Sequence, residues 1–256
     1  MNFGFISDIG SQRKHNDDCA LVIQNEHQQT LLIVCDGLGG YKGGAAASHI
    51  TLETIKDNFL ATNFNEYDEQ QIRKWYIKVI KLAQIEIDRA VLLDKDVYNM
   101  GTTVVASIII NDFVYTLNIG DSRAYLLSNN QSSQISRDHN LLQVLHERKV
   151  GPEVYEKHEK NLFSLTQFVG RTSNVVLSYD LFVTKLHHNE IIVLTSDGFH
   201  NYFELNDLYD KLIVTNQQTN NQILQQLINQ AIDNGSNDNL SLAFLFFLFY
   251  ARTNTN

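Results

Sequence analysis

The 256-residue chain has little cysteine and almost no proline: two cysteines, Cys19 and Cys35, and one proline, Pro152. The cysteines form no CxxC motif and lie in no Cys/His cluster of the sequence. This spacing argues against a disulfide scaffold and a structural zinc site, and it suits a reducing cytosol. No Pro/Ser-rich linker divides the chain, so residues 1–256 are predicted to form a single domain.

Basic residues and long hydrophobic runs are also scarce. Twenty Lys and Arg stand against 29 Asp and Glu, and the net charge of −9 leaves no obvious footprint for nucleic acid or an anionic membrane. The first residues, MNFGFISDIG, lack the basic head and apolar run of a secretory signal. The longest apolar stretch, residues 240–251, is shorter than the roughly 20 residues that span a bilayer. We therefore expect a cytoplasmic protein with no nucleic-acid or membrane partner.

Apolar residues make up 43% of the chain, which is enough for a large core. Their spacing predicts amphipathic helices at 45–60, 70–92, 204–214 and 220–233. Short apolar or alternating runs predict strands at 2–8, 18–25, 30–35, 102–110, 113–119, 123–128, 132–136, 175–184, 190–195 and from residue 240. Strands in hairpin groups and helices in consecutive pairs favour an α+β fold with antiparallel sheets and helices outside them.

Acidic residues recur at the ends of the apolar strands. Taken singly, each is typical of a turn, but five such sites border predicted buried strands. Neighbouring antiparallel strands begin and end at the same sheet edge, so these side chains can converge there. The sites are Asn16-Asp17-Asp18, Asp36-Gly37, Asp121-Ser122, Asp197-Gly198 and Asp238-Asn239.

Clustered carboxylates without a counter-charge repel one another, and divalent cations such as Mg²⁺ or Mn²⁺ relieve that repulsion. Gly37, which has no side chain, lets its carbonyl oxygen approach an ion closely. Two ions roughly 3.5–4 Å apart can share a bridging water and activate it for attack on phosphorus. Arg13, four residues before Asp17, supplies a forked donor that can grip a phosphate.

Seven blocks that contain these residues follow one another in an order that resembles the metal-dependent protein Ser/Thr phosphatases, the protein phosphatase 2C group in its compact bacterial form. The blocks are SDIGSQRKHNDD, VCDGLGGYKGGAAAS, MGTTVVASII, NIGDSRAYLL, SRDHNLLQVL, LTSDGFHNYF and GSNDNLSLAFL. The resemblance implies two packed antiparallel sheets flanked by helix pairs, with a flap near the metal site at about 138–172.

The resemblance also implies roles for individual residues. Asp36 would bridge two Mn²⁺ or Mg²⁺ ions, and Gly37 would offer its carbonyl to one of them. Arg13 would bind the substrate phosphate, and Asn239 would orient its neighbour Asp238. The remaining ligands would be Asp197 and Asp238 on one ion, Asp17 and Asp18 on the other, directly or through water, and Asp121 together with Asp197 on the third ion that bacterial members often hold.

Three positions depart from the family pattern. Asp17 stands where the family usually has glutamate, so its shorter arm would reach an ion through water. Leu38 stands where animal relatives have a histidine, so protonation of the leaving group would fall to a metal-bound water. Tyr41 replaces a histidine common in bacterial members. None of the three removes a metal ligand, and we expect an active enzyme.

The function implied is hydrolysis of phosphoserine and phosphothreonine in proteins by a metal-activated water, without a phosphoenzyme intermediate. The expected clients are phosphoproteins, among them a Ser/Thr protein kinase and its substrates, and the expected state is a monomer. Two alternatives stay open: a non-catalytic phosphoprotein-binding pseudophosphatase, and a hydrolase of small phosphate esters. His139, beside Asp138 at the start of the flap, is interpreted as a surface or packing residue, and Cys35 as a small hydrophobic residue.

Overall fold

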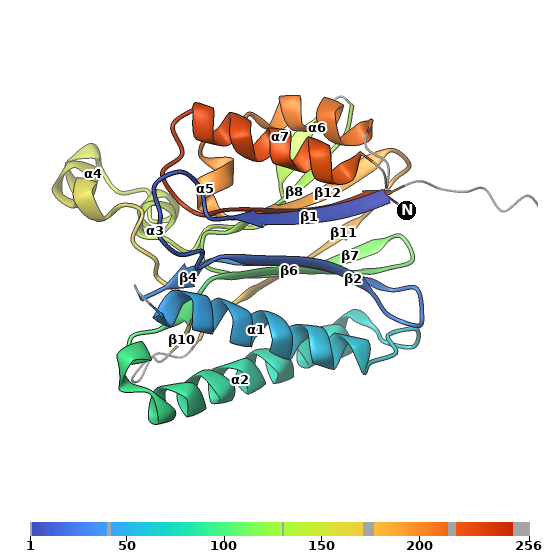
Figure 1. The fold of residues 1–256 in the computed structure, drawn as a ribbon, viewed down its shortest axis with the longest axis horizontal. Helices are drawn as coiled ribbons and strands as arrows, with labels where there is room; N and C mark the ends of the chain where they lie inside the picture. Colours follow the sequence, from blue (N-terminus) through green and yellow to red (C-terminus); the bar gives the residue numbers. More distant parts are fainter. Residues whose placement is uncertain (1, 40–41, 130, 171–176, 215–218, 248–256) are drawn as a thin grey trace, which may run out of the picture.

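In the computed structural model, which describes residues 2–39, 42–129, 131–170, 177–214 and 219–247, two five-stranded sheets lie face to face. Figure 1 shows the two sheets in the middle of the molecule. Above one lie α6 (Leu205–Ile213) and α7 (Asn220–Asp233), and below the other lie α1 (Gly43–Leu60) and α2 (Glu69–Leu93). Every strand pair within the two sheets is antiparallel. The structure therefore confirms the predicted α+β class and its four layers.

The first sheet joins the two ends of the chain. The N-terminal strand pairs with the C-terminal strand in the register Asn2 to Phe246 and Asp8 to Leu240. This pairing carries the loop after Asp8 to the beginning of the last strand. The strand order is β1 (Asn2–Asp8), β13 (Leu240–Phe247), β12 (Glu190–Thr195), β8 (Arg123–Leu127) and β9 (Ser132–Gln134).

The second sheet follows the predicted hairpins closely. Its tightest turn lies at Asn111, whose positive φ of 56° suits asparagine in a short hairpin. The strand order is β11 (Asp180–Lys185), β7 (Phe113–Ile119), β6 (Val104–Ile110), β3 (Thr30–Cys35) and β2 (Cys19–Gln24). Residues 177–179 are not part of β11, so the strand predicted at 175–184 begins later than expected; its first two residues lie outside the described part.

The helices cover the outer faces because their apolar stripes match the sheets. The stripe of α2 (Glu69–Leu93) is buried at Ile72, Trp75 and Val79, and a capping box between Asp68 and Gln71 starts the helix. On the other side α7 (Asn220–Asp233) buries Leu224, Leu227 and Ile228. The other two helices of these layers are α1 (Gly43–Leu60) and α6 (Leu205–Ile213).

Three apolar cores hold the layers together. One lies between the first sheet and α5 (Asp197–His200), α6 and α7, one between the second sheet and α1 and α2, and the third between the two sheets. β3, β6 and β13 are buried along their whole length, which explains their continuous apolar sequences. The strand ends at one edge of this sandwich are thereby fixed relative to one another.

Several short elements at that edge were not predicted. A small sheet joins β4 (Gly37–Leu38), β5 (Gly101–Thr102) and β10 (Val169–Gly170), and the four-residue helix α5 (Asp197–His200) follows β12. The predicted flap contains α3 (Leu141–Glu147), α4 (Pro152–His158) and the 3-10 turn η2 (Glu159–Asn161). Figure 1 shows α3 and α4 projecting at the end of the molecule where β4 and α5 lie.

A further 3-10 turn, η1 (Lys95–Val97), follows α2. None of the helices in the described ranges has the length and apolar character needed to cross a bilayer.

Candidate metal centre

The predicted aspartates lie at the turns around one end of the sandwich. Asp18 precedes β2 and Asp36 follows β3, while Asp121 follows β7, Asp197 begins α5 after β12, and Asp238 precedes β13. Neighbouring carboxylate charges help to raise the pKa values of Asp18, Asp36 and Asp197, and the charge of Asp238 contributes to all three shifts. Residues distant in sequence therefore share one electrostatic environment.

Asp18 is the most deeply placed of the set, with 4% of its surface exposed. The pKa of Asp18 is raised to about 7, chiefly by burial and further by the charges of Asp197 and Asp238. The side chains of Ser196 and Ser241 oppose this rise. The carboxylate oxygen Oδ2 is buried and has no hydrogen-bond partner. A buried oxygen that accepts no hydrogen bond has lost its hydration without any replacement, and a bound cation would provide that replacement.

Asp36 lies at the centre of the mutual repulsion. Burial first, and then the charges of Asp18, Asp197, Asp121 and Asp238, raise its pKa well above the ordinary value. Burial and the charge of Asp238 likewise raise the pKa of Asp197, while a side-chain hydrogen bond from Asp36 lowers it. These carboxylates can all be ionised only with a positive charge among them.

The backbone around Asp36 is fixed by the small sheet. The backbone N–H of Thr103 donates to the Asp36 carbonyl oxygen at 2.9 Å, and the backbone N–H of Asp36 donates to Thr103 Oγ1 at 3.0 Å. The next residue, Gly37, has no room for a side chain, because a Cβ there would lie 2.3 Å from the Gly44 carbonyl oxygen and 2.5 Å from that of Asp17. Only glycine allows the strand to pass this close to α1.

Asp17 lies against the first turn of α1 rather than among the coupled carboxylates. A Cβ on Gly44 would lie 2.9 Å from the Asp17 carboxyl carbon, and Ser48 Oγ donates to the Asp17 carbonyl at 2.6 Å. Asp17 Oδ1 is buried without a hydrogen-bond partner. Like Asp18, it keeps an unsatisfied oxygen that suits a cation or its water.

Asp121 lies at the turn between β7 and β8. Burial raises its pKa to about 7, and the charges of Asp197 and Asp138 add to this, while Arg123 opposes it. The turn depends on Gly120, whose φ is +107°, a conformation that side chains disfavour. The interaction with Asp197 joins Asp121 to the main cluster.

Arg13 reaches the cluster from the exposed loop after β1. Its Nη2 donates to Asp238 Oδ2 at 2.6 Å, and the Arg13 and Asp238 side chains are 51% and 32% exposed. The guanidinium is therefore at the rim, where an incoming phosphate could meet it. The backbone N–H of Asn239 donates to Asp238 Oδ1 at 2.8 Å.

The side chain of Asn239 holds the loop that carries Arg13. Its amide nitrogen donates to the carbonyl oxygens of Ile9 and His15, both at 2.9 Å, and its amide oxygen accepts from the Asp17 N–H at 2.9 Å. Asn239 thus contacts Asp238 through its backbone, whereas its side chain orders residues 9–17.

The donor set fits divalent cations that prefer oxygen. It consists of carboxylates with raised pKa values, two buried oxygens without donors and a closely packed glycine carbonyl. Among the residues described, no three carboxylate, imidazole or thiol side chains come together closely enough to hold an ion. Cations here would therefore rely on water and backbone oxygen as well, as Mg²⁺ commonly does.

Sequence reasoning did not single out the hydroxyl groups that support the aspartates. The side chains of Ser196 and Ser241 lower the pKa of Asp18, and Ser241 Oγ lies 2.9 Å from Ser7 Oγ. Both serines lie within the quoted blocks, in LTSDG and NLSLA beside Asp197 and Asn239, which was the available signal. Of the two family departures in the glycine-rich loop, Leu38 lies in β4 and Tyr41 lies outside the described residues.

Comparison with known proteins agrees with this geometry. A sequence model of the protein phosphatase 2C family matches residues 7–241. A Mycoplasma pneumoniae chain named as a protein phosphatase is 32% identical, over 94% of this chain and 93% of its own. The serine/threonine phosphatase stp of Listeria monocytogenes is 30% identical, over 94% of both chains.

Solved structures show the same fold. The serine/threonine phosphatase of S. agalactiae superposes with a TM-score of 0.82 at 27% identity, covering 95% of this chain and 98% of its own. The catalytic domain of PstP, solved with two manganese ions, gives a TM-score of 0.76 at 22% identity over 96% and 98% of the two chains. The extent of these matches shows that the chain belongs to the protein phosphatase 2C family of serine/threonine protein phosphatases.

Proposed function

We propose that this chain removes phosphate from phosphoserine and phosphothreonine of proteins by attack of water, using the cluster around Asp36 as a two-cation site. The observation that carries the proposal is the buried, mutually repelling carboxylate set with Arg13 at its rim. Family membership and the printed names of the relatives support the substrate class.

Asp36 is the residue best placed to contact both cations, because it interacts with the carboxylates on every side of it. Asp197 and Asp238 would complete one ligand shell and Asp18 and Asp17 the other, with the Gly37 carbonyl as a further ligand. When bound, a pair of Mn²⁺ or Mg²⁺ ions supplies a water of lowered pKa and neutralises charge on the phosphoryl oxygens. The two manganese ions of PstP support this number.

Arg13 would bind and orient the substrate phosphate. Its guanidinium offers paired donors that match two phosphate oxygens, and its exposure leaves room for a protein substrate. Leu38 has no proton to give, so protonation of the serine or threonine oxygen that leaves would fall to water.

Cys35, the residue before Asp36, is not suited to act as the nucleophile that would form a phosphoenzyme intermediate. Cys35 is fully buried, and its burial raises the pKa of its thiol well above the ordinary value, so it stays protonated. Direct transfer of the phosphoryl group to water follows. Acid quenching during turnover of a ³²P-labelled phosphopeptide should therefore leave no label on the protein.

The decisive experiment compares Asp36→Asn with Asp112→Asn in hydrolysis of phosphoserine and phosphothreonine peptides with Mn²⁺. Asp112 lies in the remote β6–β7 turn, paired with Lys185 at 3.4 Å. We expect Asp36→Asn to lose activity by about 100-fold or more, because it weakens both cation sites, and Asp112→Asn to match the wild type. A chelator should stop the wild-type reaction.

The other outcomes separate the alternatives. Binding of phosphopeptide without phosphate release at any Mn²⁺ concentration would identify a pseudophosphatase. Faster hydrolysis of nucleotides or sugar phosphates than of phosphopeptides would identify a small-ester hydrolase. Turnover that survives chelation would contradict the proposed site altogether.

Three further statements stay predictions. We expect a Ser/Thr protein kinase and its substrates among the client phosphoproteins, a monomeric catalytic unit in the cytoplasm, and a third cation at Asp121 beside Asp197. The raised pKa of Asp121 and its interaction with Asp197 support the last of these.

A further inference from the structure

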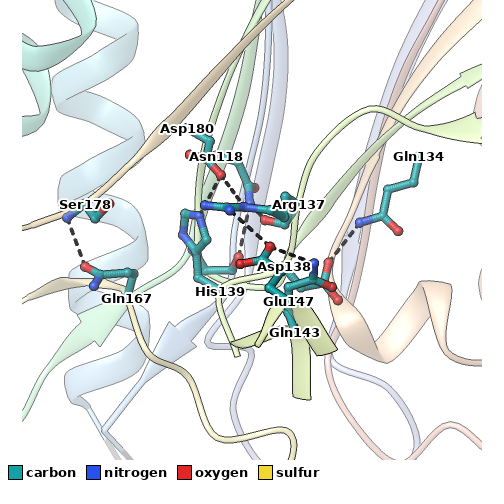
Figure 2. A network of polar contacts seen from close by, with 11 residues as sticks. Asn118, Gln134, Arg137, Asp138, His139, Gln143, Glu147, Gln167, Ser178 and Asp180 are labelled. Atoms are coloured by element: carbon teal, nitrogen blue, oxygen red, sulfur yellow. Dashed lines mark hydrogen bonds and ion pairs between the residues drawn. The ribbon is translucent and has the colours of Figure 1, made fainter. Parts of the chain in front are cut away.

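His139 is buried beside the turn that carries Asp121, and both of its ring nitrogens are engaged. The Gly120 N–H donates to His139 Nδ1 at 3.2 Å, and His139 Nε2 lies 3.1 Å from Asp180 Oδ2. Because a backbone N–H can only donate, Nδ1 is the acceptor and Nε2 carries the hydrogen that is donated to Asp180. Figure 2 shows the His139 ring next to Asp180, with Asn118 and Arg137 close by. With both nitrogens occupied, His139 is not available as a general acid or base.

A second hydrogen bond between His139 and Gly120 involves the carbonyl group of Gly120. The His139 N–H donates to the Gly120 carbonyl at 2.9 Å, so His139 binds both backbone groups of this glycine. The Asn118 amide donates to the same carbonyl at 3.1 Å. Gly120 has a φ of +107°, and a Cβ there would lie 2.6 Å from the Thr103 side chain. The direction in which the chain enters Asp121 is set by these contacts.

Asp180 holds the imidazole in place. It lies on β11 directly opposite Asn118 of β7, and its Oδ2 also accepts from Arg137 Nε at 2.8 Å. Asn118 in turn donates to the Arg137 carbonyl at 2.7 Å. The ring orientation is therefore anchored in the second sheet, through Asp180 of β11.

The backbone of His139 also joins the two ends of the predicted flap. Thr166 N–H donates to the His139 carbonyl at 2.8 Å, and the next residue, Asn140, forms a β-bridge with Leu165. Asn140 then caps α3 by accepting from the Gln143 N–H at 2.9 Å. One residue thus contacts the sheet, both flap ends and the turn before Asp121.

We propose that His139 is a positioning residue. Its hydrogen bonds fix the backbone of Gly120 and thereby orient the Asp121 carboxylate toward a cation, while its carbonyl oxygen holds Thr166 at the end of the flap. The inference rests on the proposed function, because it takes Asp121 as a metal ligand. Groups that hold a metal ligand in place without touching the metal commonly change metal affinity by about 10- to 100-fold when they are removed.

Two substitutions separate the Gly120 contact from the Asp180 contact. In His139→Asn the side-chain oxygen falls near the place of Nδ1 and can accept from Gly120, but the side chain no longer reaches Asp180. In His139→Gln the amide reaches Asp180 and leaves the Gly120 N–H without its acceptor. Binding of Mn²⁺ to each purified protein is measured by the electron paramagnetic resonance signal of free Mn²⁺, which needs no turnover.

We expect His139→Gln to bind the Asp121-dependent Mn²⁺ about 10-fold more weakly, and His139→Asn to stay closer to the wild type. Asp121→Asn identifies which ion depends on Asp121. Glu147→Gln is the matched control, because Glu147 pairs with Arg137 at 3.1 Å but contacts neither His139 nor Gly120. It should bind Mn²⁺ as the wild type does.

Equal weakening in both His139 variants, or weakening in His139→Asn alone, would overturn the proposal while the metal site itself stands. An Asp121→Asn protein with unchanged Mn²⁺ binding would overturn the ligand assignment and the positioning role together. Thermal unfolding checks that each variant is folded. His139→Leu, which removes the acceptor for the Gly120 N–H, is the second variant should His139→Gln not fold, and unchanged Mn²⁺ affinity in it would contradict the proposal.

Discussion

Arg13 and Asp238, separated by 225 positions in sequence, are joined by an ion pair of 2.6 Å between Nη2 and Oδ2. The two residues are assigned to different ligands, Arg13 to the substrate phosphate and Asp238 to a cation. In this arrangement each neutralises the other. A cation bound at Asp238 would compete with Arg13 for this carboxylate and would leave the guanidinium free for phosphate.

Replacing Arg13 with alanine should separate these two roles. We expect the KM for a phosphopeptide to rise by about 10-fold or more, since a hydrogen bond to a charged group contributes about 1.5–3 kcal/mol. The affinity for Mn²⁺ should be unchanged or stronger, because a competitor for Asp238 has been removed. Steady-state kinetics at saturating Mn²⁺ and a direct Mn²⁺ titration measure the two effects.

Arg89→Ala serves as the control, since Arg89 forms an exposed pair with Glu86 on α2, far from the site in sequence and on the outer helix layer. A loss of Mn²⁺ affinity in Arg13→Ala would show that the arginine supports the cation site instead of competing with it.

Gly37→Ala should disrupt the metal centre through the backbone. The added Cβ would lie 2.3 Å from the Gly44 carbonyl oxygen and 2.5 Å from the Asp17 carbonyl oxygen, and neither belongs to a flexible side chain. Strand β4 and α1 must separate, at a cost of about 1–3 kcal/mol in the free energy of unfolding. We expect weaker Mn²⁺ binding as well, measured by titration alongside urea unfolding.

Gly151→Ala is the comparison. Gly151 has an ordinary φ of −72° at the start of α4, and a Cβ there would meet only the movable carboxylate of Glu153. Mn²⁺ binding should be unaffected. Normal Mn²⁺ affinity in Gly37→Ala would mean that the close approach of β4 to α1 does not shape the site.

The sequence located the aspartates because each adjoins a largely apolar strand, as in TLLIVC before Asp36 and EIIVLT before Asp197. Such strands must be buried, and antiparallel pairing then brings their ends together. The side-chain contacts across the site could not be predicted in the same way. The pairing of Arg13 with Asp238 depends on how residues 9–17 fold over the start of β13. The conformation of such a loop leaves no repeating pattern in the sequence from which it could be predicted.

Short elements were missed for a related physical reason. Helix α5 has four residues and the strands of the small sheet have two each, which is too short for a repeating apolar pattern. His139 was interpreted as a surface or packing residue from its place beside Asp138 at the start of the flap. Its hydrogen-bond partners, Asp180 and Gly120, are 41 and 19 residues away.

Asn239 is predicted to stabilise the loop that carries Arg13 and Asp17. Its side chain makes three hydrogen bonds to backbone groups, two as donor and one as acceptor. In Asn239→Asp the amide nitrogen becomes an oxygen that faces two carbonyl oxygens, and in Asn239→Ala all three bonds are lost. Buried groups left without partners cost about 1–3 kcal/mol each, so both variants should unfold at lower urea concentrations.

Asn229→Asp is the control, because Asn229 lies on the outer part of α7 and only accepts a hydrogen bond from Gln225 at 3.2 Å. It should unfold as the wild type does. Asn239→Asp with wild-type stability would show that the loop is held by other contacts.

The stability of the protein without metal should fall as the pH rises. The folded-state pKa values of Asp18 and Asp121 are raised to about 7, against an ordinary value of 3.8 that applies to the unfolded chain. Between about pH 4 and 7 the folded protein keeps protons that the unfolded chain has lost. The free energy of unfolding therefore decreases across this range and levels off above it, by several kcal/mol in total at about 1.4 kcal/mol per pKa unit.

His200 acts in the opposite direction, because its burial lowers its pKa well below 6.5 and stability from this group is lost as the pH falls. The informative quantity is thus the difference between wild type and Asp121→Asn, followed by thermal unfolding in chelator at pH 5 and pH 8. The variant should lose less stability between the two pH values than the wild type does. Mn²⁺ added at pH 8 should restore the wild type, since a cation replaces the protons among the carboxylates. A wild type in chelator that is more stable at pH 8, with Asp121→Asn changing in parallel, would show that these aspartates are not held in a repelling cluster.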